Sequence, residues 1–144
     1  MSSVFVSRRK ETGKEYYDVA SELWIELRRL TGNPEIFPKR TLYTDIVPMI
    51  QSFKEMRKWL TKMETRFPTD EYNLKVRKEY LQRAIESAED LFTQMQDSIL
   101  AIPTVTPDRA EHFGQLLLHL INMLRKMKKN AKIEQEKPKP QQKK

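Results

Sequence analysis

The chain contains no cysteine among its 144 residues. Disulfide bonds, zinc-thiolate sites and cysteine nucleophiles are therefore excluded, and the absence suits a reducing cytosol. Glycine occurs only three times, and no glycine-rich phosphate loop, Gly-x-Ser-x-Gly elbow or zincin motif is present. No apolar run approaches the roughly 20 residues of a membrane span, and the apolar stretch in MSSVFVSRRKE is too short for a signal peptide. We therefore expect a cytoplasmic protein that contacts no membrane and catalyses no reaction.

The residues that are abundant favour helix. Leu, Met, Glu, Lys and Arg are all common in the chain, and each has a high helix propensity. Apolar residues recur every three or four positions in four stretches, at about residues 11–30, 42–66, 70–101 and 107–130, which predicts amphipathic helices. The connections are short and contain proline. The sequence therefore predicts one all-α domain over residues 11–130, an antiparallel up-down-up-down four-helix bundle. A flexible N-terminus is expected at residues 1–10, and a disordered Lys/Pro-rich tail at residues 131–144.

Local signals mark three of the helix ends. Gly32 suits a C-terminal cap of the first helix. Thr69 is a candidate N-cap of the third helix, and Thr106 followed by Pro107 is a strong start for the fourth.

Pro48 leaves two possibilities for the second helix. It can lie in the first turn, where its missing N–H costs nothing, or it can kink a helix that begins at Lys39. The kink is slightly favoured because Leu42 already fits the apolar pattern.

The positive charge is concentrated at one end of the chain. The net charge is +7. Residues 125–144 hold nine Lys/Arg and two Glu, whereas residues 1–124 hold 18 Lys/Arg and 18 Asp/Glu. The whole excess therefore lies in the last stretch, which favours a polyanionic partner through its field and through counterion release.

In the predicted topology, four basic helix segments meet at one pole of the bundle. These are the start of the first helix, the end of the second, the start of the third and the end of the fourth. The opposite pole receives acidic residues from the third and fourth helices: Glu86, Glu89, Asp90, Asp97, Asp108 and Glu111. The candidate nucleic-acid-binding residues are Arg8, Arg9, Lys10, Lys14, Arg57, Lys58, Lys62, Arg66, Lys75, Lys78, Arg125, Lys126, Lys128, Lys129 and Lys132. Each of these cations alone is better explained as part of a solvated face, but the pole and tail together favour binding to RNA or DNA phosphates with little base readout.

Two further residues are candidates for a partner interface. Arg77 falls within the apolar pattern of the third helix, where it either extends to solvent at the helix end or forms a partly buried ion pair with a partner. Trp59 lies at the edge of the second helix's apolar face, where it either covers the core or anchors an interface.

His112 and His119 lie seven positions apart, which does not by itself make a metal site, and the Glu-x-x-His elements of di-iron bundles are absent. The sequence thus predicts no metal site, no cofactor and no catalytic residue.

Three sequence features suggest a family. They are Phe37-Pro38-Lys39 after the first helix, Arg77-x-x-Tyr80-Leu81-x-x-Ala84 in the long third helix, and Ile121-x-Met123-Leu124-Arg125-Lys126 near the end of the fourth. Over roughly residues 14–129 the chain resembles the four-helix-bundle family that includes the 23S rRNA intervening-sequence proteins and the accessory variability determinant (Avd) proteins of diversity-generating retroelements. The basic end and Lys-rich tail make the Avd proteins the better match.

The resemblance implies a bacterial or phage-encoded protein that forms a homopentamer. It would bind the reverse transcriptase of its element together with RNA or DNA, and it would support mutagenic cDNA synthesis without an active site of its own. The alternatives are an intervening-sequence-type bundle protein and a protein–protein scaffold whose basic tail only confers solubility.

Overall fold

A computed structural model describes residues 15–134 of the chain. The predictions for the N-terminus and for residues 135–144 of the tail lie outside this range. Four α-helices make up most of the described chain: α2 (Glu15–Thr31), α3 (Val47–Glu64), α4 (Glu71–Ala101) and α5 (Pro107–Asn130). A 3-10 turn, η1 (Lys39–Thr41), and a π-helical turn, η2 (Leu42–Ile46), precede α3. No strand occurs between residues 15 and 134, so the all-α prediction is confirmed for that range.

The core is built from the apolar faces that the sequence spacing predicts. Each helix contributes residues three or four positions apart, because such residues share one face of an α-helix. The fully buried large side chains include Leu23, Leu27, Leu30, Phe37, Met49, Met56, Met63, Leu81, Leu91, Ile102, Phe113, Leu117, Leu120 and Leu124. Buried methionines occur along the whole length of α3, at Met49, Met56 and Met63, and their unbranched side chains can adapt to irregular gaps. Leu118 of α5, in contrast, is 47% exposed.

The structure decides the position of Pro48. The α-helix begins at Val47, and Pro48 lies in its first turn, where no intrahelical hydrogen bond is lost. The preceding residues are helical but follow a different hydrogen-bond pattern, with the Val47 N–H bonded to the Leu42 carbonyl. The α-helix thus starts as in the first-turn alternative, although helical residues continue back to Lys39, as in the alternative with a kink. Leu42, whose fit to the apolar pattern favoured the kink, is 40% exposed.

The helix ends match the sequence signals at two positions and differ at one. Thr106 accepts a hydrogen bond from the Arg109 N–H at 3.2 Å and caps α5, as predicted. The predicted N-cap Thr69 is wrong, because Asp70 accepts from the Asn73 N–H at 2.8 Å and is the cap of α4. Gly32 follows α2 directly, and a Cβ at this position would lie 2.8 Å from the Arg28 carbonyl oxygen. Only glycine fits this close approach.

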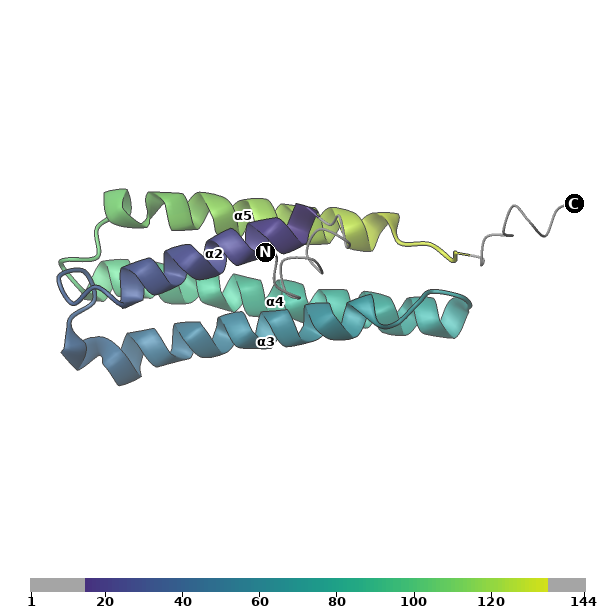
Figure 1. Ribbon diagram of the computed structural model, residues 1–144, viewed down its shortest axis with the longest axis horizontal. Coiled ribbons are helices and arrows are strands. Elements are labelled where there is room, and N and C mark those ends of the chain that lie inside the picture. The colour runs from purple at the N-terminus through teal and green to yellow at the C-terminus, as the bar shows by residue number, and fades with distance from the viewer. Residues whose placement is uncertain (1–14, 135–144) are drawn as a thin grey trace, which may run out of the picture.

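The helices lie side by side along the long axis of the molecule (Figure 1). α3 packs along α4, and α5 packs against both α2 and α4. Side chains also join particular helix ends. The Tyr16 hydroxyl near the start of α2 donates to Glu64 at the end of α3, and Ser98 near the end of α4 donates to Asp45 before α3 at 2.8 Å.

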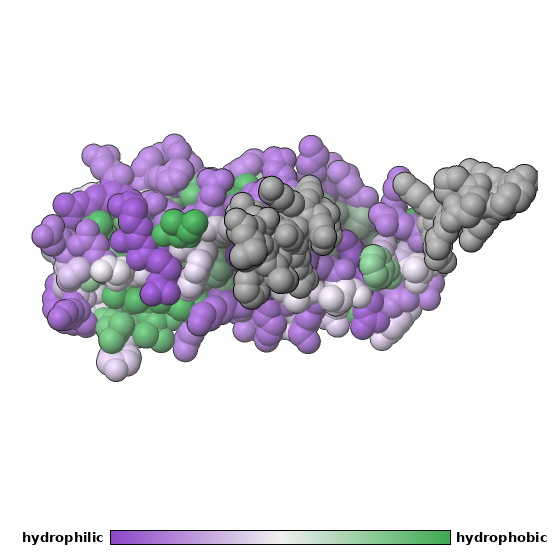
Figure 2. All heavy atoms as spheres, in the orientation of Figure 1, coloured by the Kyte–Doolittle hydropathy of each residue, from purple (hydrophilic) through white to green (hydrophobic). Residues whose placement is uncertain are grey.

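The α3–α4 pair extends beyond the start of α2 and the end of α5 (Figure 1). α4 is the longest helix, with 31 residues, and its first turns pack against the last turns of α3. Hydrophilic side chains cover most of the face in Figure 2, with an apolar area near the beginning of α3. The projecting end of the α3–α4 pair is accessible, and it exposes Phe67 and Tyr72 among its polar side chains.

Candidate nucleic-acid interface

The ends of three helices meet at the projecting end of the molecule. Arg66, after α3, donates to the Asn73 side chain of α4 at 2.9 Å. Lys128 of α5 donates to Gln82 of α4 at 2.8 Å. Beyond α5, the Glu134 N–H donates to the Pro68 carbonyl between α3 and α4 at 2.9 Å. We call residues 57–83 and 125–132 together the basic end.

The basic end carries a large excess of positive charge. It holds thirteen Lys/Arg and four Asp/Glu, whereas residues 84–124 hold six Asp/Glu and one Arg. The opposite end is mixed rather than acidic, because Arg28, Arg29, Lys39 and Arg40 add positive charge there. The molecule is thus electrostatically asymmetric, and its field attracts polyanions to one end.

Several predicted nucleic-acid-binding residues make contacts within the chain. Lys58 pairs with Glu55 at 3.1 Å, and Arg125 pairs with Glu89. Both pairs are about half exposed. Exposed pairs of this kind are weak, so a polyanion can compete for their cations.

Other predicted cations face solvent. Lys62, Lys75, Lys126, Lys129 and Lys132 are exposed, and Lys78 is half-buried. Lys75, Lys78 and Lys128 line a groove of about 440 Å³ between the start of α4 and the end of α5, together with Glu71 and Glu79. The N-terminal candidates Arg8, Arg9, Lys10 and Lys14 lie outside the described residues.

Arg57 differs from the other predicted cations because it is enclosed by aromatic rings. Its guanidinium carbon lies 5.1 Å from the ring centroid of Tyr17 and 5.4 Å from that of Phe53. Within the described chain its buried Nε has no hydrogen-bond partner. Arg57 is therefore half-buried between α2 and α3.

Arg77 closes the end of α3. Its Nη1 donates to the carbonyl oxygens of Met63 and Arg66, each at 2.8 Å. The Met63 carbonyl also accepts the Arg66 N–H at 3.2 Å, and the nearby cation adds a second hydrogen bond and opposes the negative end of the helix dipole. The structure thus gives Arg77 a partner within its own chain. Its predicted role at a partner interface stays a prediction.

Trp59 is the centre of a cluster that joins α3 to α4. Its indole stacks on Tyr80 at 5.7 Å with an interplanar angle of 29°, and its Nε1 donates to Glu55 at 3.2 Å. Three cations lie over the ring: Lys58 Nζ at 4.7 Å, Lys62 Nζ at 5.6 Å and the Arg83 guanidinium at 5.0 Å from the centroid. We call these residues the Trp59 cluster.

Glu55 is the carboxylate of this cluster. The hydrogen bond from Lys58 holds the pKa of the Glu55 carboxyl below its usual range, although burial opposes the shift. Glu55 is therefore ionised at neutral pH and orients both the lysine and the indole.

Glu55, Tyr80 and Arg83 are the members of the cluster that sequence reasoning did not assign to a site. Lys58, Trp59 and Lys62 are close in sequence and can be grouped from helical spacing alone. Arg83 and Tyr80 belong to α4, so their place depends on the alignment of α3 against α4. The sequence carries no direct signal for that alignment.

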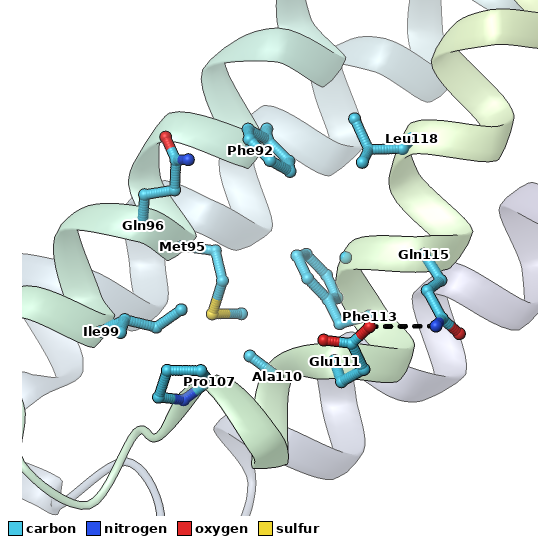
Figure 3. Close-up of a pocket in the computed structure, with 11 residues that line it drawn as sticks. Phe92, Met95, Gln96, Ile99, Pro107, Ala110, Glu111, Phe113, Gln115 and Leu118 are labelled. Atoms are coloured by element: carbon cyan, nitrogen blue, oxygen red, sulfur yellow. Dashed lines mark hydrogen bonds between the residues drawn. The ribbon is translucent and has the colours of Figure 1, made fainter.

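An apolar groove lies at the other end of the molecule, between α4 and α5. Its volume is about 270 Å³. Phe92, Met95, Ile99 and Phe113 line it, and a hydrogen bond of 3.0 Å joins Gln115 to Glu111 beside it (Figure 3). Such a mainly apolar lining suits packing against another apolar surface.

Two buried polar groups have partners within the chain. Glu26 is 6% exposed and accepts two hydrogen bonds from Arg29, at 2.9 and 2.5 Å. Those bonds lower the pKa of the Glu26 carboxyl despite its burial. Burial, together with the hydrogen bond to Glu64, raises the pKa of the Tyr16 hydroxyl above its ordinary value of 10.0. Both groups are held by structural contacts.

In the described part of the chain, no three His, Asp or Glu residues gather in a group that could hold a metal ion. His112 and His119 are both exposed. None of the helices within residues 15–134 is long and apolar enough to cross a membrane.

The chain was compared with family models, curated proteins and solved structures, and nothing in any of the three matches it.

Proposed function

We propose that this protein is a non-catalytic, nucleic-acid-binding accessory protein. The observation that carries the proposal is the basic end, where cations from α3, α4 and α5 lie together with few acids between them. A surface of this kind binds phosphates by charge, with little dependence on sequence. The resemblance to Avd proteins adds the partner: the reverse transcriptase of the same retroelement, whose mutagenic cDNA synthesis this protein would support.

The proposal includes an architecture. The four helices alternate in direction as an antiparallel up-down-up-down bundle. The bonds from Tyr16 to Glu64 and from Ser98 to Asp45 support this, because each joins the start of one helix to the end of the next.

The proposed assembly is a homopentamer, following the resemblance. The apolar groove between α4 and α5 and the exposed Leu118 offer a surface that a second copy could cover. The mass of the intact assembly, measured by native mass spectrometry, tests the number of copies.

The first prediction concerns salt and charge. Replacing Arg125, Lys126, Lys128 and Lys129 with Gln should weaken binding to both RNA and DNA by about tenfold or more at low salt. The slope of log affinity against log salt should also become shallower, because fewer counterions are released. Fluorescence anisotropy with labelled oligonucleotides at several salt concentrations measures both quantities.

A matched control removes the same number of charges elsewhere. In that variant Arg28, Lys39, Arg40 and Lys54, which lie outside the basic end, become Gln. Affinity should fall much less than in the first variant. Equal losses of affinity in the two variants would mean that only net charge matters. Binding that survives both high salt and the first variant would refute the role of the basic end in binding.

The reverse-transcriptase partner needs a separate experiment. The tagged protein should co-purify with a reverse transcriptase encoded beside its own gene, and mass measurement of the complex gives the stoichiometry. A gene placed inside a ribosomal RNA insertion would favour the intervening-sequence alternative. A chain that shifts no nucleic acid on a gel would favour the scaffold alternative.

A further inference from the structure

The Trp59 cluster combines a fixed aromatic ring with concentrated positive charge. Lys58 and Lys62 are four positions apart on α3 and therefore share a face. Arg83 comes from the neighbouring helix, α4. All three cations lie within 5.6 Å of the same ring centroid. Within residues 15–134, Glu55 is the one carboxylate bonded to the cluster, so the cluster keeps an excess of positive charge.

The indole of Trp59 is held in place before any ligand binds. Tyr80 stacks on it, Glu55 accepts a hydrogen bond from its Nε1, and the side chain is half-buried. A ring that is already ordered loses little conformational freedom on binding, which favours affinity. The exposed lysines, in contrast, have long flexible side chains and can leave the ring face for a nearby phosphate.

We propose that the Trp59 cluster binds single-stranded nucleic acid, with an unpaired base stacked on Trp59 and flanking phosphates held by Lys58, Lys62 and Arg83. The inference rests on the proposed nucleic-acid-binding function and adds the strandedness of the ligand. Stacking of bases on aromatic side chains, combined with a positively charged surface, is how proteins bind single strands without sequence preference. Inside a duplex both faces of each base are already stacked, so all but the terminal pairs can use the cations but not the ring.

The test uses the full-length protein and two probes. One is an oligodeoxythymidine of about ten nucleotides, a length within the range of known single-strand sites. The other is a blunt duplex of similar length. The background variant Trp24→Phe leaves Trp59 as the sole tryptophan, so quenching of fluorescence reports directly on its ring. We expect the single strand to quench Trp59 and to bind about tenfold more tightly than the duplex.

Variants then separate the ring from the charges. Trp59→Leu should lower affinity for the single strand by about tenfold and leave affinity for the duplex nearly unchanged. Combined Gln substitutions of Lys58, Lys62 and Arg83 should weaken both. Trp24→Leu is the matched control, since Trp24 also contacts an aromatic ring, Phe53, and a cation, Arg28, and it should alter neither affinity.

Circular dichroism checks that each variant folds. If Trp59→Leu does not fold, Trp59→Phe keeps the packing and should give a smaller loss of single-strand affinity. Equal loss for both probes, or no loss for either, would overturn the inference while leaving the proposed function intact. Loss of reverse-transcriptase co-purification with unchanged oligonucleotide binding would make Trp59 a protein contact and would also overturn it. If neither probe binds at low salt, the proposed function itself fails.

Discussion

Arg77 shows how one side chain can hold two helices together. It projects from α4, and its Nη1 donates to two carbonyl oxygens at the end of α3. The sequence shows an arginine within an apolar pattern but does not show its hydrogen-bond acceptors. These acceptors are backbone carbonyls, which every residue has, so residue types do not identify them. Its position was predictable, whereas its capping contact was not.

Replacing Arg77 with Met should lower the free energy of unfolding by about 2 kcal/mol, because hydrogen bonds to a charged group contribute about 1.5–3 kcal/mol. Methionine keeps most of the apolar contact of the arginine stem, so the loss reports on the hydrogen bonds. Urea denaturation measures the change.

Lys75→Met is the control for this prediction. Lys75 is exposed on the same helix, and its substitution should change stability by no more than about 0.5 kcal/mol. Equal effects at the two positions would rule out a capping role for Arg77.

At the scale of single helices, the two glycines at positions 32 and 114 differ in the space available for a side chain. Gly114 lies in the interior of α5, and a Cβ added there would meet nothing within 4 Å. Gly32, after α2, has no room for a Cβ beside the Arg28 carbonyl. The same substitution is therefore expected to have opposite effects at the two positions.

Gly114→Ala should raise the free energy of unfolding by about 1 kcal/mol, the difference in helix propensity between the two residues. Gly32→Ala should lower it. Thermal unfolding of both variants, with native mass spectrometry of each, tests the pair. Destabilisation and loss of assembly on Gly114→Ala would mean instead that another copy of the chain occupies the space over Gly114.

Helix ends with several local signals were predictable from sequence. α5 begins at Pro107 after the cap Thr106, as the cap and the proline together indicated. The start of α4 was misplaced by one residue, because Thr69 and Asp70 are both good caps and only backbone geometry chooses between them. The π-helical turn η2 was not predicted, because the apolar pattern extends back to Leu42. In η2 the backbone hydrogen bonds join residues five apart, as from the Val47 N–H to the Leu42 carbonyl.

At the scale of the whole molecule, charge distribution was more predictable than contact geometry. Counting residues located the net charge, and the meeting of α3, α4 and α5 at one end follows from short connections. The Trp59 cluster could not be predicted from such counts. Its members come from α3 and α4, and the offset between these helices is set by the packing of many core side chains. Sequence spacing alone therefore suggested the lysines of the cluster but not Arg83 or Tyr80.

Ending the chain after Glu134 tests the contribution of the last residues. This truncation keeps every residue that the structure describes and removes four Lys and one Glu. The unfolding free energy should not change, while the slope of log affinity against log salt should fall by up to about 3 for single strands. Circular dichroism and salt titration measure the two quantities, and an unchanged slope would show that these lysines contact no phosphate.

The hydrogen bond between Glu134 and Pro68 has a consequence for binding strength. It places Glu134 beside the connection between α3 and α4, next to the basic end. Lysines attached by a short linker act at a high effective concentration, on the order of millimolar, toward a ligand already bound nearby. Under the proposed function, the basic end and the lysines after Glu134 would therefore act as one bivalent site, and binding by the first would lower the entropic cost of binding by the second.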